Sequence, residues 1–171
     1  TCALPICVHE ATGRDITGDG APEIVLESDS GGNHCCVDLF VYTVTPTVSR
    51  LAHVESANCG TKLVDLDGDG VLELVTCDDE PDIPAAKALG CSEAERPAPK
   101  VIYRFEAATG QYRLATPAYA KRRREALRRA VRDAEQRSPA DSCAMYAAAL
   151  DVLYGGDRRE ARSEEHTSEL Q

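Results

Sequence analysis

The chain has 171 residues and a formal net charge of −10, with 29 acidic against 19 basic side chains. Its length fits about one domain with a sizeable core, and its acidity points away from nucleic acid and toward cations as partners. It contains no apolar run of about 18 residues, so the sequence predicts no membrane-spanning helix. Most of the acids lie in residues 1–116, whereas residues 117–161 carry more basic than acidic side chains.

The two ends of the chain are set aside from fold reasoning. The last residues, RSEEHTSELQ at 162–171, resemble the translation of a common sequencing adapter. On that interpretation His166 is not a ligand candidate, and we expect the native C-terminus to be missing. The chain starts at Thr1 rather than Met, so we expect any signal peptide to lie upstream.

Short strand patterns bounded by turn residues dominate the chain up to about residue 116. They are EIVLE (23–27), VDLFVYTV (37–44), SRLAHVE (49–55), TKLVDL (61–66), LELVTC (72–77), KVIYRFE (100–106) and QYRLA (111–115). Polar and apolar residues alternate in the last two, and the intervening AATG predicts a hairpin loop. The fold class predicted for residues 1–116 is therefore mainly β.

Residues 78–99 are rich in proline and in small and acidic side chains, so we expect a long insertion with one short helical turn. From residue 118 the apolar period changes, and the arginine-rich segment 118–137 predicts an amphipathic helix. A second helix is predicted from Ser138 as its N-cap to a stop at Gly155. The whole chain is thus predicted to be α+β, with a C-terminal α-helical hairpin in residues 117–161.

Two segments, DITGDGAPEIV (15–25) and DLDGDGVLELV (65–75), repeat one arrangement of oxygen-bearing residues. Counted from the first aspartate, side-chain oxygens fall at positions 1, 3, 5 and 9, and the carbonyl of position 7 can turn inward. The predicted metal ligands are Asp15, Thr17, Asp19, Ala21 and Glu23 in one loop, and Asp65, Asp67, Asp69, Val71 and Glu73 in the other. Such oxygen-only ligation suits Ca²⁺ better than Mg²⁺, which keeps more of its waters. The first loop is the weaker of the two, because Thr17 replaces an acid.

Glycine at position 6, Gly20 or Gly70, permits the sharp turn that this arrangement needs. An EF-hand would require a glutamate at position 12 between two helices, but here position 12 is Leu26 or Thr76 and the flanks are strands. The alternative is a pair of solvated Asp-Gly turns. Recurrence of the same ligand pattern favours a metal site.

These two segments resemble the FG-GAP/VCBS-type repeat of integrin-like β-propellers, whose inter-strand loops hold calcium. The stretches SGGNHCC (30–36) and PAPKVIYRFEAATGQYRL (97–114) are similar to parts of a set of uncharacterised bacterial extracytoplasmic proteins that carry such repeats. The resemblance covers about residues 12–116 and implies a β-propeller-like fold with calcium loops, without an established activity. Two loops supply two or three blades at most, whereas closed propellers have about four or more, so we expect no closed ring from this chain alone.

Eight cysteines predict an oxidising compartment and structural disulfides. They are Cys2, Cys7, Cys35, Cys36, Cys59, Cys77, Cys91 and Cys143. No C-x-x-C spacing supports a zinc ribbon or a thioredoxin-like site. Among the roughly 105 possible pairings, the strand order would allow Cys59 to meet Cys35 or Cys36, and Cys77 to meet Cys91.

The sequence therefore predicts a noncatalytic, calcium-binding, disulfide-stabilised, extracytoplasmic domain (periplasmic or secreted) that binds or scaffolds an unidentified protein or polysaccharide. The resemblance implies a bacterial source. No Ser/His/Asp arrangement is evident, and we expect His9 and His53 to be packing or surface residues. The basic segment 121–132 has no interleaved aromatic residues, so a solvated helix face is preferred to binding of nucleic acid or lipid.

Two alternative functions stay open. The first is the repeat scaffold of a secreted hydrolase whose catalytic part is missing, or lies among the acids Asp78, Asp79, Glu80 and Asp82. The second is a vicinal-cysteine redox or metal protein built on Cys35 and Cys36 beside His34.

Overall fold

The structure, a computed structural model, describes residues 6–29, 37–56, 59–78, 83–92 and 98–119, with single residues at 143, 146, 147, 150, 153 and 154. The chain forms two compact units, Thr1–Asp79 with Val101–Leu114, and Glu80–Lys100 with Ala115–Gln171. Both acidic loops lie in the first unit, which is also where the β-sheets are built.

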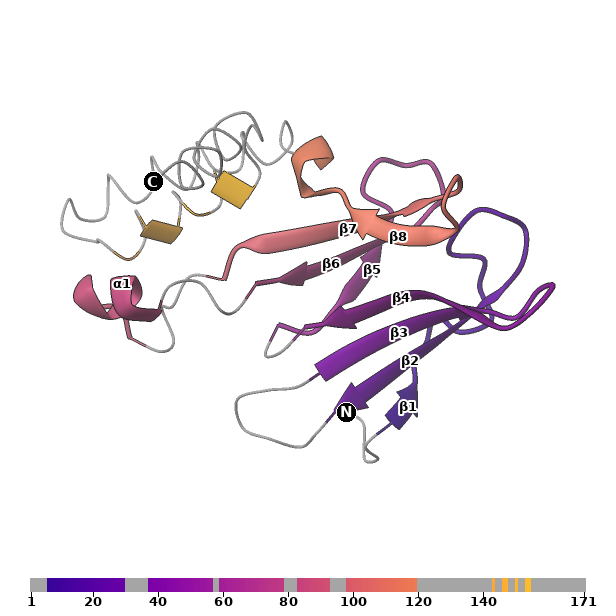
Figure 1. Ribbon diagram of the computed structural model, residues 1–171, viewed down its shortest axis with the longest axis horizontal. Coiled ribbons are helices and arrows are strands. Elements are labelled where there is room, and N and C mark those ends of the chain that lie inside the picture. The colour runs from indigo at the N-terminus through magenta and orange to yellow at the C-terminus, as the bar shows by residue number, and fades with distance from the viewer. Residues whose placement is uncertain are drawn as a thin grey trace, which may run out of the picture. The chain divides into compact units, whose positions relative to one another are not determined.

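The first sheet has four strands in the order β1-β2-β3-β4, each antiparallel to the next (Figure 1). They are β1 (Ile6–Val8), β2 (Glu23–Asp29), β3 (Val37–Thr43) and β4 (Ser49–Glu55). Successive side chains of a strand point to opposite faces. Accordingly Val25, Leu39, Val41 and Val54 are buried on one face, whereas Ile24 is exposed on the other.

The second sheet also has four strands, in the order β5-β6-β7-β8. They are β5 (Lys62–Val64), β6 (Glu73–Cys77), β7 (Lys100–Glu106) and β8 (Gln111–Leu114). The pairing of Glu106 with Gln111 closes the β7–β8 hairpin around AATG, so the hairpin predicted there is confirmed.

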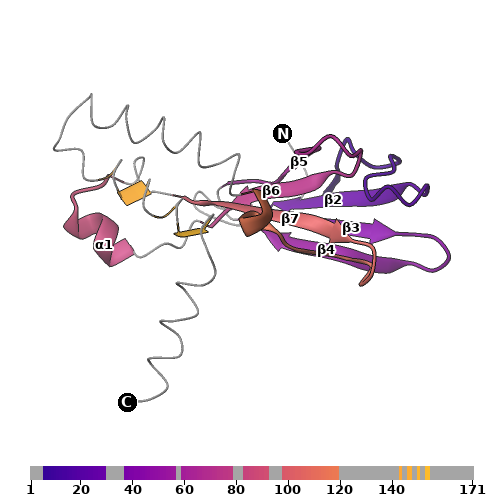
Figure 2. The same ribbon diagram turned by 90° about the horizontal axis from the view of Figure 1, so that it is seen from above.

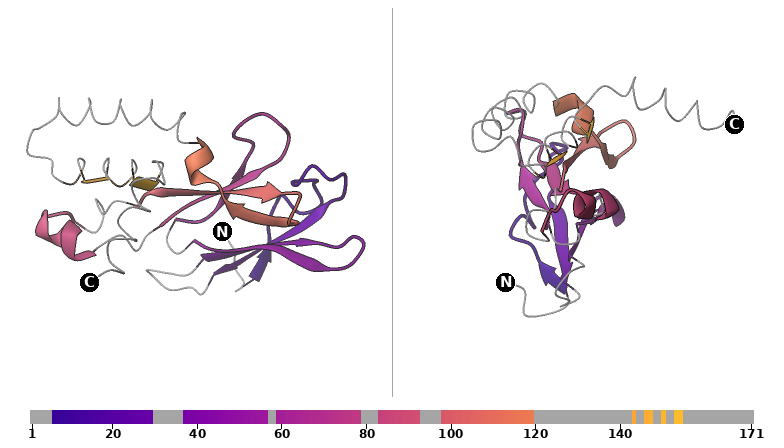
Figure 3. Two further views of the ribbon diagram at one scale, coloured as in Figure 1. Left: turned by 45° about the horizontal axis from the view of Figure 1, so that its top comes forward. Right: turned by 90° about the vertical axis from the view of Figure 1, so that its left-hand side faces the viewer.

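Each sheet has an acidic loop at the same place, between its first and second strands. Residues 9–22 join β1 to β2, and residues 65–72 join β5 to β6. The two loops lie side by side at one end of the first unit, as the views in Figures 1, 2 and 3 agree. A backbone hydrogen bond from Leu72 N to the Ile16 carbonyl, 2.9 Å long, joins them directly.

One hydrophobic core supports both sheets and the first loop. It contains residues of β2, β3 and β4, together with Leu74 of β6 and Tyr112 of β8. Ile16, at the second position of the first loop, is fully buried in the same core. The loop that precedes β2 is therefore held by apolar burial as well as by hydrogen bonds.

All seven predicted strands are confirmed, as is the short helix in the insertion, which is α1 (Ile83–Ala88). Sequence reasoning missed β1, a strand of three residues. The described residues form two open sheets and no closed propeller. Among these residues, no helix is both long enough and apolar enough to cross a membrane.

The predicted C-terminal helical hairpin falls mostly outside the described residues. Where the first of its helices was expected to begin, Thr116–Tyr119 forms a short 3-10 helix. Single residues between 143 and 154 are helical, so the hairpin stays a prediction.

Two cysteine pairs lie at disulfide distance. Cys59 pairs with Cys77 across a Cα–Cα distance of 5.7 Å, and Cys91 pairs with Cys143 across 5.5 Å. The expected pairings of Cys59 with Cys35 or Cys36, and of Cys77 with Cys91, are therefore wrong. The register of β5 and β6, in which Lys62 opposes Val75, brings Cys59 to Cys77 instead. Paired cysteines of this kind fit an extracellular protein.

Replacing Leu74 by alanine should destabilise the protein by about 2–5 kcal/mol, because it opens a cavity in the shared core. Leu74 is 0% exposed, whereas Leu114 of the same sheet is 50% exposed. The matched Leu114→Ala change should cost less than about 1 kcal/mol. Urea denaturation of the two variants measures the difference, and equal losses would contradict the assignment of the core.

Candidate metal centre

The two acidic loops share one hydrogen-bond frame. Both carboxylate oxygens of the first aspartate accept backbone N–H groups from positions 4 and 6, and the aspartate at position 5 accepts the N–H of position 7. The donors are Gly18 (2.7 Å) and Gly20 (2.9 Å) to Asp15, Ala21 (2.8 Å) to Asp19, Gly68 (2.6 Å) and Gly70 (3.1 Å) to Asp65, and Val71 (2.9 Å) to Asp69. The loops are therefore folded alike, down to individual atoms.

This frame favours the ionised form of the first aspartate in the second loop. The N–H of Gly68, followed by that of Gly70, holds the pKa of Asp65 below its usual value. Both oxygens of Asp65 thus take part in shaping the turn while its charge is kept.

The glutamate at position 9 begins the second strand of each sheet and is fully buried. Glu23 Oε2 accepts the N–H of Ile16, and Glu73 Oε2 accepts the N–H of Leu66, both at 2.8 Å. These bonds close each loop onto the strand that follows it. They use one oxygen of each carboxylate, and the two loops differ in what the second oxygen contacts.

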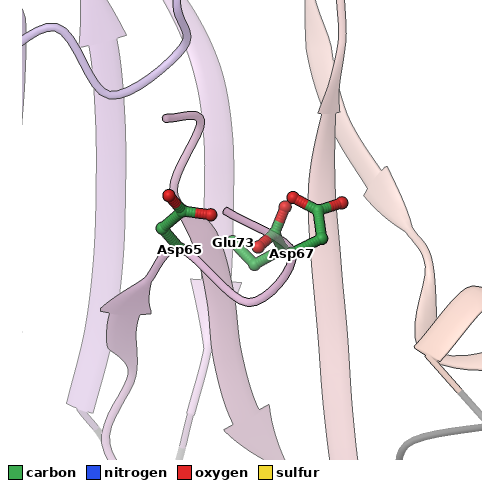
Figure 4. A group of neighbouring side chains, drawn as sticks. All are labelled: Asp65, Asp67 and Glu73. Atoms are coloured by element: carbon green, nitrogen blue, oxygen red, sulfur yellow. The ribbon is translucent and has the colours of Figure 1, made fainter. Parts of the chain in front are cut away.

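In the second loop, Asp65, Asp67 and Glu73 form a cluster that could hold a metal ion, with one oxygen of each within 4.8 Å of the others. Figure 4 shows the three carboxylates converging within a single turn of the loop. Glu73 Oε1 is buried and has no hydrogen-bond partner. A buried carboxylate oxygen without a donor is costly, so this atom requires a cation or another positive group nearby.

A positive group is present, and it comes from β7. The Arg104 guanidinium lies 3.1 Å from Asp67 Oδ2 through Nη1, contacts Asp69 Oδ2 through Nη2, and lies 3.8 Å from Glu73 Oε1 through Nε. At 3.8 Å, Arg104 and Glu73 form an ion pair but no hydrogen bond. The guanidinium thus contacts three of the four carboxylates of the loop, and the loop keeps a net negative charge.

In the first loop a neutral hydroxyl takes the corresponding place. Thr17, nearly buried, donates to Glu23 Oε1 at 3.5 Å. Burial, and then the charges of Asp19 and Asp15, raise the pKa of Glu23 above its usual value. The first loop therefore places its buried glutamate beside a hydroxyl rather than a third aspartate, and its being the weaker cation site stays a prediction.

Tyr112 of β8 connects the two loops. Its hydroxyl lies 3.0 Å from the Leu72 carbonyl and 3.4 Å from the Ile16 carbonyl, one in each loop. Burial, and then the nearby carboxylates led by Glu23, raise the pKa of Tyr112 well above its usual value. Leu72, at position 8 of the second loop, donates its N–H to the first loop. The first loop cannot donate in return from its own position 8, because Pro22 lies there and has no N–H.

The structure brings together three of the ten predicted ligands: Asp65, Asp67 and Glu73. Asp69 is turned toward Val71 N and Arg104, and Asp15 and Asp19 bond within their own loop. For Ala21 and Val71 the structure describes N–H groups that donate to carboxylates, and carbonyl ligation by these two residues stays a prediction.

Arg104 and Tyr112 were missed by sequence reasoning. Each is separated from its partners by a long stretch of chain, 35 residues between Arg104 and Asp69 and 96 between Tyr112 and Ile16. The available signal was an arginine in the middle of the strand KVIYRFE, next to a hairpin.

The remaining candidate residues are the histidines, the vicinal cysteines and the acids of the insertion. His53 stacks on Phe40 with ring centroids 4.4 Å apart and lies 3.8 Å from Asp38, while His9 accepts the N–H of Ala11. Both histidines are therefore packing or surface residues, as predicted. His34, Cys35 and Cys36 lie outside the described residues, and so do the predicted acids at 79, 80 and 82.

Fold and site together define a pair of antiparallel sheets with an acidic loop that could hold a metal ion. In comparisons with known proteins, no family model, no curated protein and no solved structure matches the chain.

Glycine at position 4 should matter more in the first loop than in the second. Gly18 and Gly68 both have positive φ, 75° and 84°. An alanine Cβ at Gly18 would also meet Val71 Cγ2 at 3.0 Å, whereas at Gly68 it would meet open space. We expect Gly68→Ala to lower the free energy of unfolding by about 1–2 kcal/mol through backbone strain alone, and Gly18→Ala to lower it further. Thermal unfolding compares the two variants, and equal costs would argue against close packing of the loops.

Replacing Tyr112 by phenylalanine should cost about 1–3 kcal/mol at neutral pH, because the Leu72 carbonyl loses its hydroxyl donor. The pKa of Tyr112 is raised in the folded state, so its stabilising contribution is present below the unfolded pKa of about 10 and is lost as pH rises above it. Wild-type stability should therefore fall more steeply than that of Tyr112→Phe above pH ~10. Tyr42→Phe, at a hydroxyl with no hydrogen bond among the described residues, should keep the wild-type profile in urea titrations across this range.

Proposed function

We propose that the chain is a noncatalytic, extracytoplasmic binding or scaffold domain that binds Ca²⁺ at the loop of residues 65–73. The observation that carries the proposal is Glu73 Oε1, a buried carboxylate oxygen without a hydrogen-bond partner, close to Asp65 and Asp67. Asp65, Asp67 and Glu73 would hold the ion. A bound cation would supply the positive charge that this oxygen lacks within hydrogen-bonding distance.

The chemistry of the donors supports calcium over other metals. Every candidate side-chain ligand is a carboxylate, and the cluster contains no histidine or cysteine of the kind that zinc and copper prefer. Calcium accepts six to eight oxygens in flexible geometry, which suits a loop with a partly exposed rim. Magnesium demands a tighter octahedron and keeps several waters, so it should bind more weakly.

The fold supports a structural role for the ion. The loop is tied to the strand after it through Glu73 and to the first loop through Leu72. A cation that holds the 65–73 loop would therefore steady both loops at this end of the unit, and binding would be coupled to stability. The disulfide pairs are consistent with a periplasmic or secreted location, where calcium is available and the partner would be a protein or a polysaccharide.

The proposal is tested by calorimetric titration of the oxidised chain with Ca²⁺ and, separately, with Mg²⁺, after removal of metal by a chelator. We expect Ca²⁺ to bind, to bind more tightly than Mg²⁺, and to raise the thermal unfolding temperature. Glu73→Gln keeps an oxygen for the Leu66 N–H but removes the charge, and it should weaken Ca²⁺ binding by about tenfold or more.

The matched control is Glu55→Gln, which makes the same change at the exposed end of β4, outside both loops. It should leave the affinity within about twofold of wild type. Absence of Ca²⁺ binding to the wild-type chain would refute the proposal, and equal loss in both variants would show that only overall charge matters.

A further inference from the structure

Arg104 contacts the same oxygens that a metal ion in the 65–73 loop would need. Its guanidinium engages Asp67 Oδ2, Asp69 Oδ2 and Glu73 Oε1, which belong to three of the four acidic positions. Among the described residues Arg104 forms no ion pair with the first aspartate, Asp65, both oxygens of which accept backbone N–H groups. The guanidinium therefore lies where the acidic loop would otherwise hold its cation.

A calcium ion and this guanidinium cannot share these oxygens. Calcium ligands lie about 2.3–2.6 Å from the ion, so an ion bound to Asp67 and Glu73 would stand within a few ångströms of the guanidinium carbon. Two positive groups at that separation repel one another, most strongly next to a buried carboxylate, where solvent screens poorly. One of them has to leave.

The surroundings of Arg104 permit it to be the one that leaves. Its side chain is 40% exposed and extends from β7, whereas Asp69 and Glu73 are each held by a backbone N–H group. The long aliphatic stem lets the guanidinium swing into solvent without movement of β7. No such cation faces Glu23 among the described contacts of the first loop, where the Thr17 hydroxyl serves instead.

Resting on the calcium-binding function proposed above, we propose that Arg104 is a built-in counter-cation of the 65–73 loop, and that a divalent cation binds there by displacing its guanidinium. Arg104 keeps the loop ordered when calcium is scarce and lowers the apparent calcium affinity when it is present. The apparent dissociation constant equals the intrinsic constant divided by the fraction of molecules in which Arg104 has released the carboxylates. The residue thus sets the calcium concentration at which the loop fills.

The test is calorimetric titration with Ca²⁺ alone of wild type, Arg104→Gln and the control Arg113→Gln. Arg113 is the cross-strand partner of Arg104, and among the described residues it forms no ion pair, so its removal reproduces the loss of charge without the contact. Arg104→Gln should bind Ca²⁺ about tenfold more tightly than wild type, and Arg113→Gln less than about twofold more tightly. Without calcium, Arg104→Gln should unfold at a lower temperature than wild type, and saturating calcium should remove that difference.

A second measurement uses the wild-type chain and does not depend on the folding of a variant. The exchange of the Arg104 Nη–H groups with solvent, followed by NMR and assigned by their absence in Arg104→Lys, should accelerate when calcium is added, because Nη1 and Nη2 then lose Asp67 and Asp69. Unchanged or weaker Ca²⁺ binding by Arg104→Gln, or unchanged Nη–H exchange, would overturn the inference while the calcium proposal stands. If neither wild type nor Arg104→Gln binds Ca²⁺, the proposed function fails and the inference fails with it.

Discussion

The burial of one glutamate at the start of each sheet's second strand is the constraint on which the rest of this end of the protein depends. Glu23 and Glu73 are both 0% exposed, and an unbalanced carboxylate at such a position is costly. Each gives one oxygen to the backbone N–H of the residue after the loop's first aspartate. That bond closes the loop. The two loops then differ in the group that faces the second oxygen of the glutamate.

The residue at position 3 determines how the remaining oxygen is balanced. Thr17 is short, buried and able to donate, so the first loop satisfies Glu23 from within. Asp67 cannot donate when ionised and adds a further negative charge, so the second loop must obtain a positive group from elsewhere. A single difference, threonine against aspartate, therefore separates a loop closed by a hydroxyl from a loop that attracts a cation. The common backbone frame makes this comparison direct.

The sequence was informative wherever the structure depends on local pattern. Seven of the eight strands, the hairpin around AATG, the short helix of the insertion and the turn geometry at Gly20 and Gly70 all follow from residue types and spacing within a few positions. The recurrence of the loop pattern also located the acidic cluster. These features need no knowledge of which strands meet.

What the sequence could not supply depends on contacts between distant segments. Arg104 reaches the second loop only because β7 belongs to the same sheet as β6. The pattern of polar and apolar residues in β7 does not predict that its side chain contacts the acids. Cys59 and Cys77 meet because of the register of β5 and β6, which spacing alone does not fix. The carboxylates were recognised as needing a positive partner, but the pattern could not show that the chain carries one itself.

The bond from Leu72 to Ile16 gives the pair of loops a direction. Because Pro22 has no N–H, the first loop can accept this bond from its neighbour but cannot return an equivalent one from the same position. Two segments that are nearly interchangeable in their internal bonding are thus not interchangeable in order. A chain with the two loops transposed would keep each turn intact and lose this direct backbone bond between them. The order of the loops along the chain therefore depends on one tertiary amide nitrogen, that of Pro22.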